Sequence, residues 1–453
     1  MPAKKIAIAC QGGGAHTAFT AGVLIPLLQE HHKPDPAINI VALSGTSGGA
    51  ICALLAWFEL LVPAKSPSER SRLTAFWSDP YPEGNASAEP GAAWLTDLVD
   101  FTLTGRLPWQ HLTDSLRTDF IERIKPLIAA QQNSPLHLNV DSNPYFFHRL
   151  FELLGPPLSL APPASAIGES AAFWGEKTQN WWQNFFASTE ELLNGSALRH
   201  ELDVQTLFRS LLERHLSGAD IEQLTARIAE NSHSPKLLVG AVDVLKAHPI
   251  GQHCLAAEQQ SLETNFKTFH IDQIIQSKPL EEARSAVIDA VLASTALPLL
   301  MRAVPYEGSV YWDGLYASNP PIVELPDIHG SNCNQDGSDN NPDEIWVIRI
   351  NPMTRSKEPD NMMDILDRRN ELAGNIALMQ EVRTIQHLNG CILRRSEDGP
   401  ERRYKTLAFK FIDLPEELAP ELMYGSKNNR QQSFLTRLLA EGESRGRQVL
   451  DSL

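Results

Sequence analysis

Residues 41–55 restrict the fold more than any other stretch, because they combine a short apolar strand, a tight turn and an apolar helix. The turn reads Gly-Thr-Ser-Gly-Gly, and Gly45, Ser47 and Gly49 fit the G-x-S-x-G pattern of a nucleophile elbow. An elbow needs small residues beside the serine, since a Cβ there would clash where the strand turns into the helix. Ser47 would lie at a helix N-terminus, which favours developing negative charge. Glycine and serine also form ordinary turns, so the flanking strand and helix are what favour the elbow.

A second glycine-rich turn comes earlier in the chain. Gly12, Gly13 and Gly14 separate a predicted strand over residues 5–10 from a predicted helix over 17–30. This arrangement can cradle an anion with backbone N–H groups. It lacks the G-x-G-x-x-G spacing and downstream acid of a dinucleotide site, and the G-K-[ST] of a phosphate-binding loop. An oxyanion hole and an ordinary tight turn remain as interpretations.

Strand and helix patterns alternate on both sides of a central insertion. The alternation predicts a parallel α/β sheet, with both glycine-rich turns at the carboxyl ends of strands, where such sheets place their sites. After the insertion, the patterns predict strands at 236–245, 266–271, 344–351 and 404–414 and helices at 281–293, 361–393 and 428–450.

Residues 61–235 form the insertion, in which helical periodicity alternates with proline-rich stretches. We interpret it as a mainly helical cap over the sheet. The insertion contains an aromatic cluster, and helical spacing would place several of its rings on one face. The core of the cap is the favoured role for these rings, and an acyl-chain tunnel or an interfacial membrane patch is the functional alternative. The cluster comprises Phe173, Trp174, Trp181, Trp182, Phe185 and Phe186.

A late aspartate follows a short β-like run over residues 309–313. Asp313-Gly314 is in isolation a turn dipeptide. The Asp-Gly pairs at Asp336 and Asp398 lie in polar stretches, whereas Asp313 ends an apolar strand. This difference makes Asp313 a candidate functional residue.

The charge balance excludes some classes of partner. Lys+Arg 39 against Asp+Glu 55 gives a net charge of −16, which argues against nucleic acid and against bulk attraction to an anionic membrane. The five cysteines are scattered and form no C-x-x-C pair, so we expect neither a metal site nor a disulfide framework. The N-terminal apolar run, Ile6–Ala9, is too short for a signal-peptide core, and no segment approaches the length of a transmembrane helix. A cytoplasmic protein without a cofactor is therefore expected; the sequence does not indicate its oligomeric state.

Three blocks, in this order, resemble the patatin-like phospholipases, a family of serine acyl hydrolases. The resemblance covers roughly residues 4–60 and 236–352. It implies a three-layer α/β/α sandwich with a mainly parallel central sheet and a large helical insertion. The blocks are Gly12-Gly13-Gly14, Gly45-Thr46-Ser47-Gly48-Gly49 and Asp313-Gly314, the last flanked by Ala293-Ser294-Thr295-Ala296-Leu297-Pro298 and Asn319-Pro320-Pro321.

The family's chemistry implies roles for the matching residues. Ser47 would be the nucleophile and Asp313 its general base, in a dyad without histidine that works through an acyl-enzyme. The amides around Gly12, Gly13 and Gly14 would form the oxyanion hole. The catalytic domain would span residues 1–352, including the insertion at 61–235. Residues 353–453 would be a mainly helical extension packed on the core.

Two departures and one rival mechanism complete the site prediction. His16 and Thr17 stand where the family often has arginine and glycine, and Leu315 stands where it commonly has a small residue. We interpret His16 as a helix cap; a hydrogen-bond donor near the oxyanion is the alternative. A Ser-His-Asp triad through His387 is the rival, and it requires a histidine nitrogen next to Ser47.

The favoured function is hydrolysis of lipid acyl esters, of the phospholipase A or lysophospholipase type, with peripheral membrane contact. An intracellular storage polyester or another acyl ester is an alternative substrate. A catalytically weak or inactive protein of the same fold, using its insertion to bind a membrane or a protein, is the alternative from another functional class. Because substrate choice would depend on the insertion, the sequence leaves the ester unassigned.

Overall fold

The computed structural model describes residues 3–63, 70–79, 204–230, 234–249, 263–298, 301–326, 341–355, 357–359, 362–395, 405–415, 417–418, 422, 426–427 and 431–453. Nearly all of them belong to one compact unit. Most of the predicted insertion lies outside the described residues. The predictions of a helical cap and of an aromatic cluster in it are therefore not examined by the structure.

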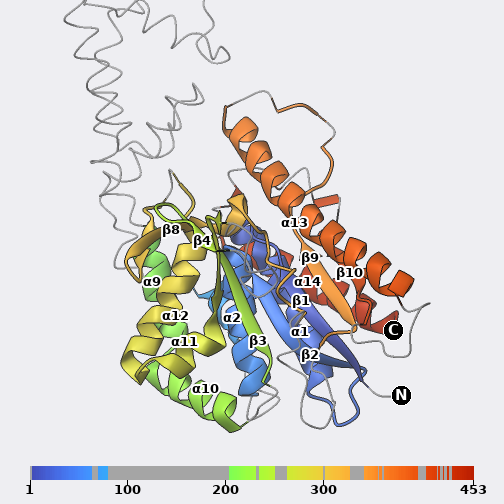
Figure 1. Cartoon of the computed structure of the whole chain (residues 1–453), viewed down its shortest axis with the longest axis horizontal. Helices are drawn as coiled ribbons and strands as arrows, with labels where there is room; N and C mark the ends of the chain where they lie inside the picture. The colour runs from blue at the N-terminus through green and yellow to red at the C-terminus, as the bar shows by residue number, and fades with distance from the viewer. Residues whose placement is uncertain are drawn as a thin grey trace, which may run out of the picture. The chain divides into compact units, whose positions relative to one another are not determined.

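The main sheet has eight strands among the described residues, and its path runs β10-β9-β1-β2-β3-β8-β7, with β6 also paired to β3 (Figure 1). The first five strands of that path run parallel to one another, whereas β6, β7 and β8 pair in antiparallel fashion. The strands are β1 (Lys4–Cys10), β2 (Ile38–Gly45), β3 (Lys236–Asp243), β6 (Phe266–His270), β7 (Val304–Tyr306), β8 (Ser309–Asp313), β9 (Glu344–Arg349) and β10 (Ala408–Asp413). A separate two-stranded sheet pairs β4 (His248–Pro249) with β5 (Glu263–Thr264).

Helices cover both faces of the main sheet, which makes the predicted α/β/α sandwich correct. Alternate residues of each strand point to opposite faces, so Ile6 and Ile8 join one apolar core and Ala7 and Ala9 another. The first core contains residues of α1, α2, α12 and α14, and the second contains residues of α13. The helices are α1 (Ala18–His31), α2 (Gly48–Leu61), α3 (Arg72–Ser78), α9 (Val204–His215), α10 (Gly218–Glu230), α11 (Ile271–Ser277), α12 (Leu280–Thr295), α13 (Met362–Arg395) and α14 (Gln432–Asp451), with short 3₁₀ turns η1 (Gly14–Thr17) and η4 (Gly314–Tyr316).

Two ends of the predicted elements differ from the structure for local reasons. The strand predicted over residues 236–245 ends at Asp243, because its carboxylate accepts the Leu245 and Lys246 amides at 2.9 and 2.8 Å and turns the chain. The helix predicted from Thr17 is preceded by the 3₁₀ turn η1, and its α-helical part begins at Ala18.

The strand register explains how the three predicted blocks come together. Cys10 pairs with Gly45 across β1 and β2, so the loops after these parallel strands leave the same edge. Gly45 pairs with Val239 of β3, and Asp313 pairs with Ala241 further along β3. Since β8 runs antiparallel to β3, the chain after Asp313 continues back toward the level of the loop after Gly45.

Candidate active site

The elbow is built as the G-x-S-x-G pattern requires. Ser47 follows β2, caps the N-terminus of α2 and has φ 55° and ψ −132°, in the left-handed region that a non-glycine residue rarely adopts. A Cβ at Gly49 would press into the Cys10 carbonyl oxygen, and one at Gly45 would lie 2.5 Å from the Gly49 carbonyl oxygen. The strained backbone therefore persists because the two glycines let β1, β2 and α2 approach closely.

A residue of the block over 293–298 holds the backbone of the elbow by hydrogen bonds. The Ser47 N–H donates to Ser294 Oγ at 2.9 Å, and the Ser294 hydroxyl donates to the Gly240 carbonyl at 2.6 Å. Ser294 lies at the end of α12 and is fully buried. This short relay ties the Ser47 backbone to the middle of the sheet.

Replacing Ser294 by alanine is expected to lower the free energy of unfolding by about 1–3 kcal/mol, because two buried polar groups lose their partner. Turnover should also slow, because the Ser47 backbone loses its restraint. Denaturant unfolding and ester hydrolysis measure the two effects. Ser285→Ala removes a hydroxyl from the exposed face of the same helix and serves as the control. Equal stability of the two variants would contradict the relay.

Asp313 is brought directly to Ser47. It is 2% exposed, its carboxylate accepts the Leu315 amide at 2.9 Å, and the Ser47 side chain lies beside the carboxylate. Burial raises the pKa of Asp313 to about 7, and the Leu315 amide and the Ser47 side chain lower it in part. A carboxylate with a pKa near neutrality can take a proton from the serine and return it, which suits a general base.

The glycine run also lies against Ser47. A Cβ at Gly12 would lie 2.8 Å from Ser47 Cβ, so the Gly12 backbone passes directly against the serine. The Gly12 N–H donates to Asn319 Oδ1 at 2.7 Å, and its carbonyl accepts from Asn351 Nδ2 at 3.1 Å. The amides of Gly13 and Gly14 have no acceptor among the described residues. Of the three glycines predicted for the oxyanion hole, Gly12 therefore has its amide engaged in this conformation.

His16 does not cap a helix, contrary to the favoured interpretation of the sequence. It lies inside η1, and neither η1 nor α1 has a side-chain cap. Its buried ring instead meets Ser426 Oγ at 2.7 Å through Nε2. Burial, with Lys427 nearby, lowers the pKa of His16 to about 3, so the ring is neutral at physiological pH. The contact occurs because the segment at residues 426–427 packs against the glycine run.

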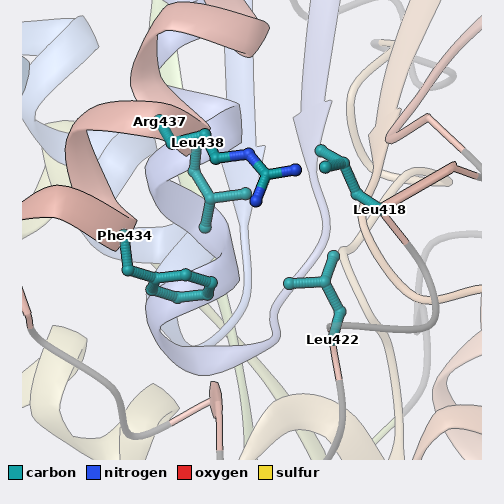
Figure 2. Close-up of a pocket in the computed structure, with 5 residues that line it drawn as sticks. All are labelled: Leu418, Leu422, Phe434, Arg437 and Leu438. Carbon is teal, nitrogen blue, oxygen red and sulfur yellow. The ribbon is translucent and has the colours of Figure 1, made fainter.

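Figure 2 shows a small pocket between α14 and the segment before it, lined by Leu418, Leu422, Phe434, Arg437 and Leu438. Its lining includes none of the predicted site residues. The Phe434 ring lies edge-on to His16, with 6.3 Å between the ring centroids. This pocket therefore lies next to His16, which follows the glycine run, and not next to Ser47 and Asp313.

The histidine of the alternative Ser-His-Asp triad, His387, is not part of this site. His387 is exposed on α13, and within the described part of the chain no histidine nitrogen is hydrogen-bonded to Ser47. The described residues also contain no group of three or more His, Cys, Asp or Glu side chains arranged to hold a metal ion. No helix in this part of the chain is both long and apolar enough to cross a bilayer.

In a comparison with known protein families, residues 8–326 match a model described as patatin-like phospholipase. The match covers well over half of the chain and contains all three blocks. The chain belongs to the patatin-like phospholipase family. It is accordingly placed among lipid acyl hydrolases. No curated protein matches the chain significantly. In this patatin-like chain, β9, α13, β10 and α14 lie beyond the matched residues.

Several residues that support the site were not assigned a role from the sequence. Ser294 and Asn319 belong to blocks that carried the resemblance, but their partners are far away in sequence. Asn351 and Gly374 lie outside the matched residues, and Gly374 faces Leu315, with a Cβ there 2.8 Å from Leu315 Cδ1. The bulkier residue after Asp313-Gly314 is thus accommodated against a glycine of α13.

Proposed function

We propose that this patatin-like chain is a serine esterase of phospholipase A or lysophospholipase type, with Ser47 and Asp313 as a catalytic dyad. The placement of the Ser47 side chain beside the buried Asp313 carboxylate, at the N-terminus of α2, is the observation that carries the proposal. A serine needs an adjacent base to become a nucleophile, and Asp313 is the base beside it.

The reaction follows from this arrangement. Ionised Asp313 takes the Ser47 proton as Oγ attacks the ester carbonyl. The amides of Gly13 and Gly14 and the N-terminus of α2 stabilise the oxyanion that forms. The intermediate collapses as protonated Asp313 gives its proton to the leaving alcohol, which leaves an acyl-serine. Water then attacks the acyl group while Asp313 takes its proton. Collapse of the second intermediate releases the acid as protonated Asp313 returns this proton to the departing Ser47 Oγ, which restores the hydroxyl and the carboxylate.

The test is hydrolysis of nitrophenyl esters, phospholipid vesicles, lysophospholipid and a storage polyester by the purified full chain. Ser47→Ala is expected to lower kcat by about 10⁴-fold or more, since the covalent step has no other nucleophile. Ser433→Ala, at an exposed serine, is the matched control. A fluorophosphonate probe should label the wild type and not Ser47→Ala.

The outcomes separate the functional classes. Undiminished hydrolysis by Ser47→Ala would sink the proposed dyad. A folded wild type that neither hydrolyses any of these esters nor takes the probe would point to the inactive, partner-binding alternative. The ester that is cleaved best identifies the substrate class.

A further inference from the structure

We propose that Asn319 is a positioning residue that sets the oxyanion loop, and that helix α13 holds Asn319 in place. The inference rests on the proposed function. The inference extends the proposed function to residues of α13, which lie beyond the part of the chain that matches the family.

Asn319 joins two loops that lie 307 residues apart in the sequence. It is fully buried, and its Oδ1 accepts the Gly12 N–H at 2.7 Å. Gly12 passes directly against Ser47, so the Asn319 side chain fixes the peptide closest to the nucleophile. The residue follows η4, the turn that begins after Asp313. The loop carrying the base therefore anchors the loop carrying the oxyanion donors.

This anchor determines which amides are available to an oxyanion. A buried N–H that loses its acceptor is costly, so without Asn319 the Gly12 peptide would have to turn toward another acceptor. Asn319 orients the Gln11–Gly12 peptide through the Gly12 N–H, and Asn351, which donates to the Gly12 carbonyl at 3.1 Å, orients the Gly12–Gly13 peptide and with it the Gly13 N–H. In the proposed mechanism the following amides, those of Gly13 and Gly14, stabilise the oxyanion, so their placement depends on these two fixed peptides.

Helix α13 packs directly on the Asn319 side chain. A Cβ at Gly374 would lie 2.5 Å from Asn319 Nδ2, so any side chain there would displace the amide. Glu381, two turns further along, accepts the Ile322 and Val323 amides at 2.6 and 3.0 Å and also the Ser318 hydroxyl. The chain is thus held by Glu381 on both sides of Asn319.

The same helix also holds the base of the glycine run. Asn375 Oδ1 accepts from Gln11 Nε2 at 2.9 Å, and Gln11 Oε1 accepts the Ile350 and Asn351 amides at 3.0 Å each. Adjacent residues of α13, Gly374 and Asn375, therefore contact both loops. One helix outside the family match sets the distance between them.

The experiment compares Asn319→Ala and Gly374→Ala with wild type and with Asn389→Ala. The control removes a similar side chain from α13 that bonds only the Leu407 backbone, away from the dyad. For each full-length variant, kcat and KM are measured on a nitrophenyl ester. The affinity of a trifluoromethyl ketone is measured as well, because its adduct with Ser47 carries an oxyanion. Melting temperature reports folding.

Asn319→Ala is expected to lower kcat by about 10- to 100-fold, somewhat less than removal of an oxyanion donor itself, with KM changed less than about threefold. Ketone affinity should fall in parallel with kcat. Gly374→Ala should show the same pattern to a smaller extent, and Asn389→Ala should not. A merely structural role would move the melting temperature without this selective loss of ketone affinity.

The outcomes distinguish a failure of the positioning role of Asn319 from a failure of the proposed dyad. If Ser47→Ala is inactive but Asn319→Ala and Gly374→Ala keep kcat and ketone affinity within about twofold of wild type, the positioning role is wrong and the dyad stands. If Ser47→Ala remains active, the proposed function itself fails. Should Asn319→Ala not fold, Gly374→Ala decides, because it displaces the Asn319 amide without removing any of its polar atoms.

Discussion

Replacing Asp313 by asparagine is expected to abolish ester hydrolysis and, at the same time, to stabilise the folded chain above pH 7. The loss of activity follows because an amide cannot take the Ser47 proton. General-base removal should lower kcat by about 10³- to 10⁴-fold. Asparagine keeps an oxygen that can accept the Leu315 amide, so the turn after β8 should remain.

The gain in stability follows from the pKa of Asp313, which burial raises from 3.8 to about 7. Between these two values the folded chain holds a proton that the unfolded chain has released. The free energy of unfolding of the wild type therefore falls as pH rises through this window, and the loss is complete above pH 7. Asparagine has no charge to bury, so the variant should exceed the wild type by up to about 4 kcal/mol at pH 8 and by little at pH 4.

Urea unfolding of both proteins at pH 4, 6 and 8 measures this difference. A difference that does not change with pH would show that Asp313 is not the group with the raised pKa. The wild-type rate provides an independent check. Since the base must be ionised, kcat/KM should rise with pH through about 7 and level off above it.

Replacing Gly442 by valine is expected to detach the last helix from the core. α14 crosses α1 at Gly442 and Gly22, and a Cβ at either glycine would overlap backbone of the facing helix, at Phe19 and Leu439 respectively. Backbone cannot move aside as a flexible side chain can. The free energy of unfolding should therefore fall by about 3 kcal/mol or more, at the upper end of overpacking effects.

The loss would reach the site, because α1 follows the glycine run. Ala440→Val places the same side chain on the exposed face of α14 and is the control. Valine has a higher helix propensity than glycine, so a loss confined to Gly442→Val can come only from the clash. Thermal and urea unfolding compare the variants, and equal stabilities would refute the close helix contact.

Local patterns predicted most of the regular elements. The apolar runs at β1, β2, β3 and β9 and the periodicity of α13 and α14 are visible in the sequence, because each depends on neighbouring residues. The β7–β8 hairpin was not predicted as a pair. β7 has three residues, and its turn at Glu307 and Gly308 has positive φ at both positions. Short strands carry too little periodicity to indicate their direction in a sheet.

The sequence by itself determined the family and the α/β/α fold, and it singled out Ser47 and Asp313 as the candidates for the dyad. These depend on short motifs whose glycines are required by local backbone geometry. Only the tertiary structure decided that Asp313 is buried against the Ser47 hydroxyl and that the Gly12 amide is engaged by Asn319. It also decided that Ser294 and α13 hold the loops. These contacts join residues far apart in the chain, and burial and hydrogen-bond partners exist only once strand register and helix packing are set.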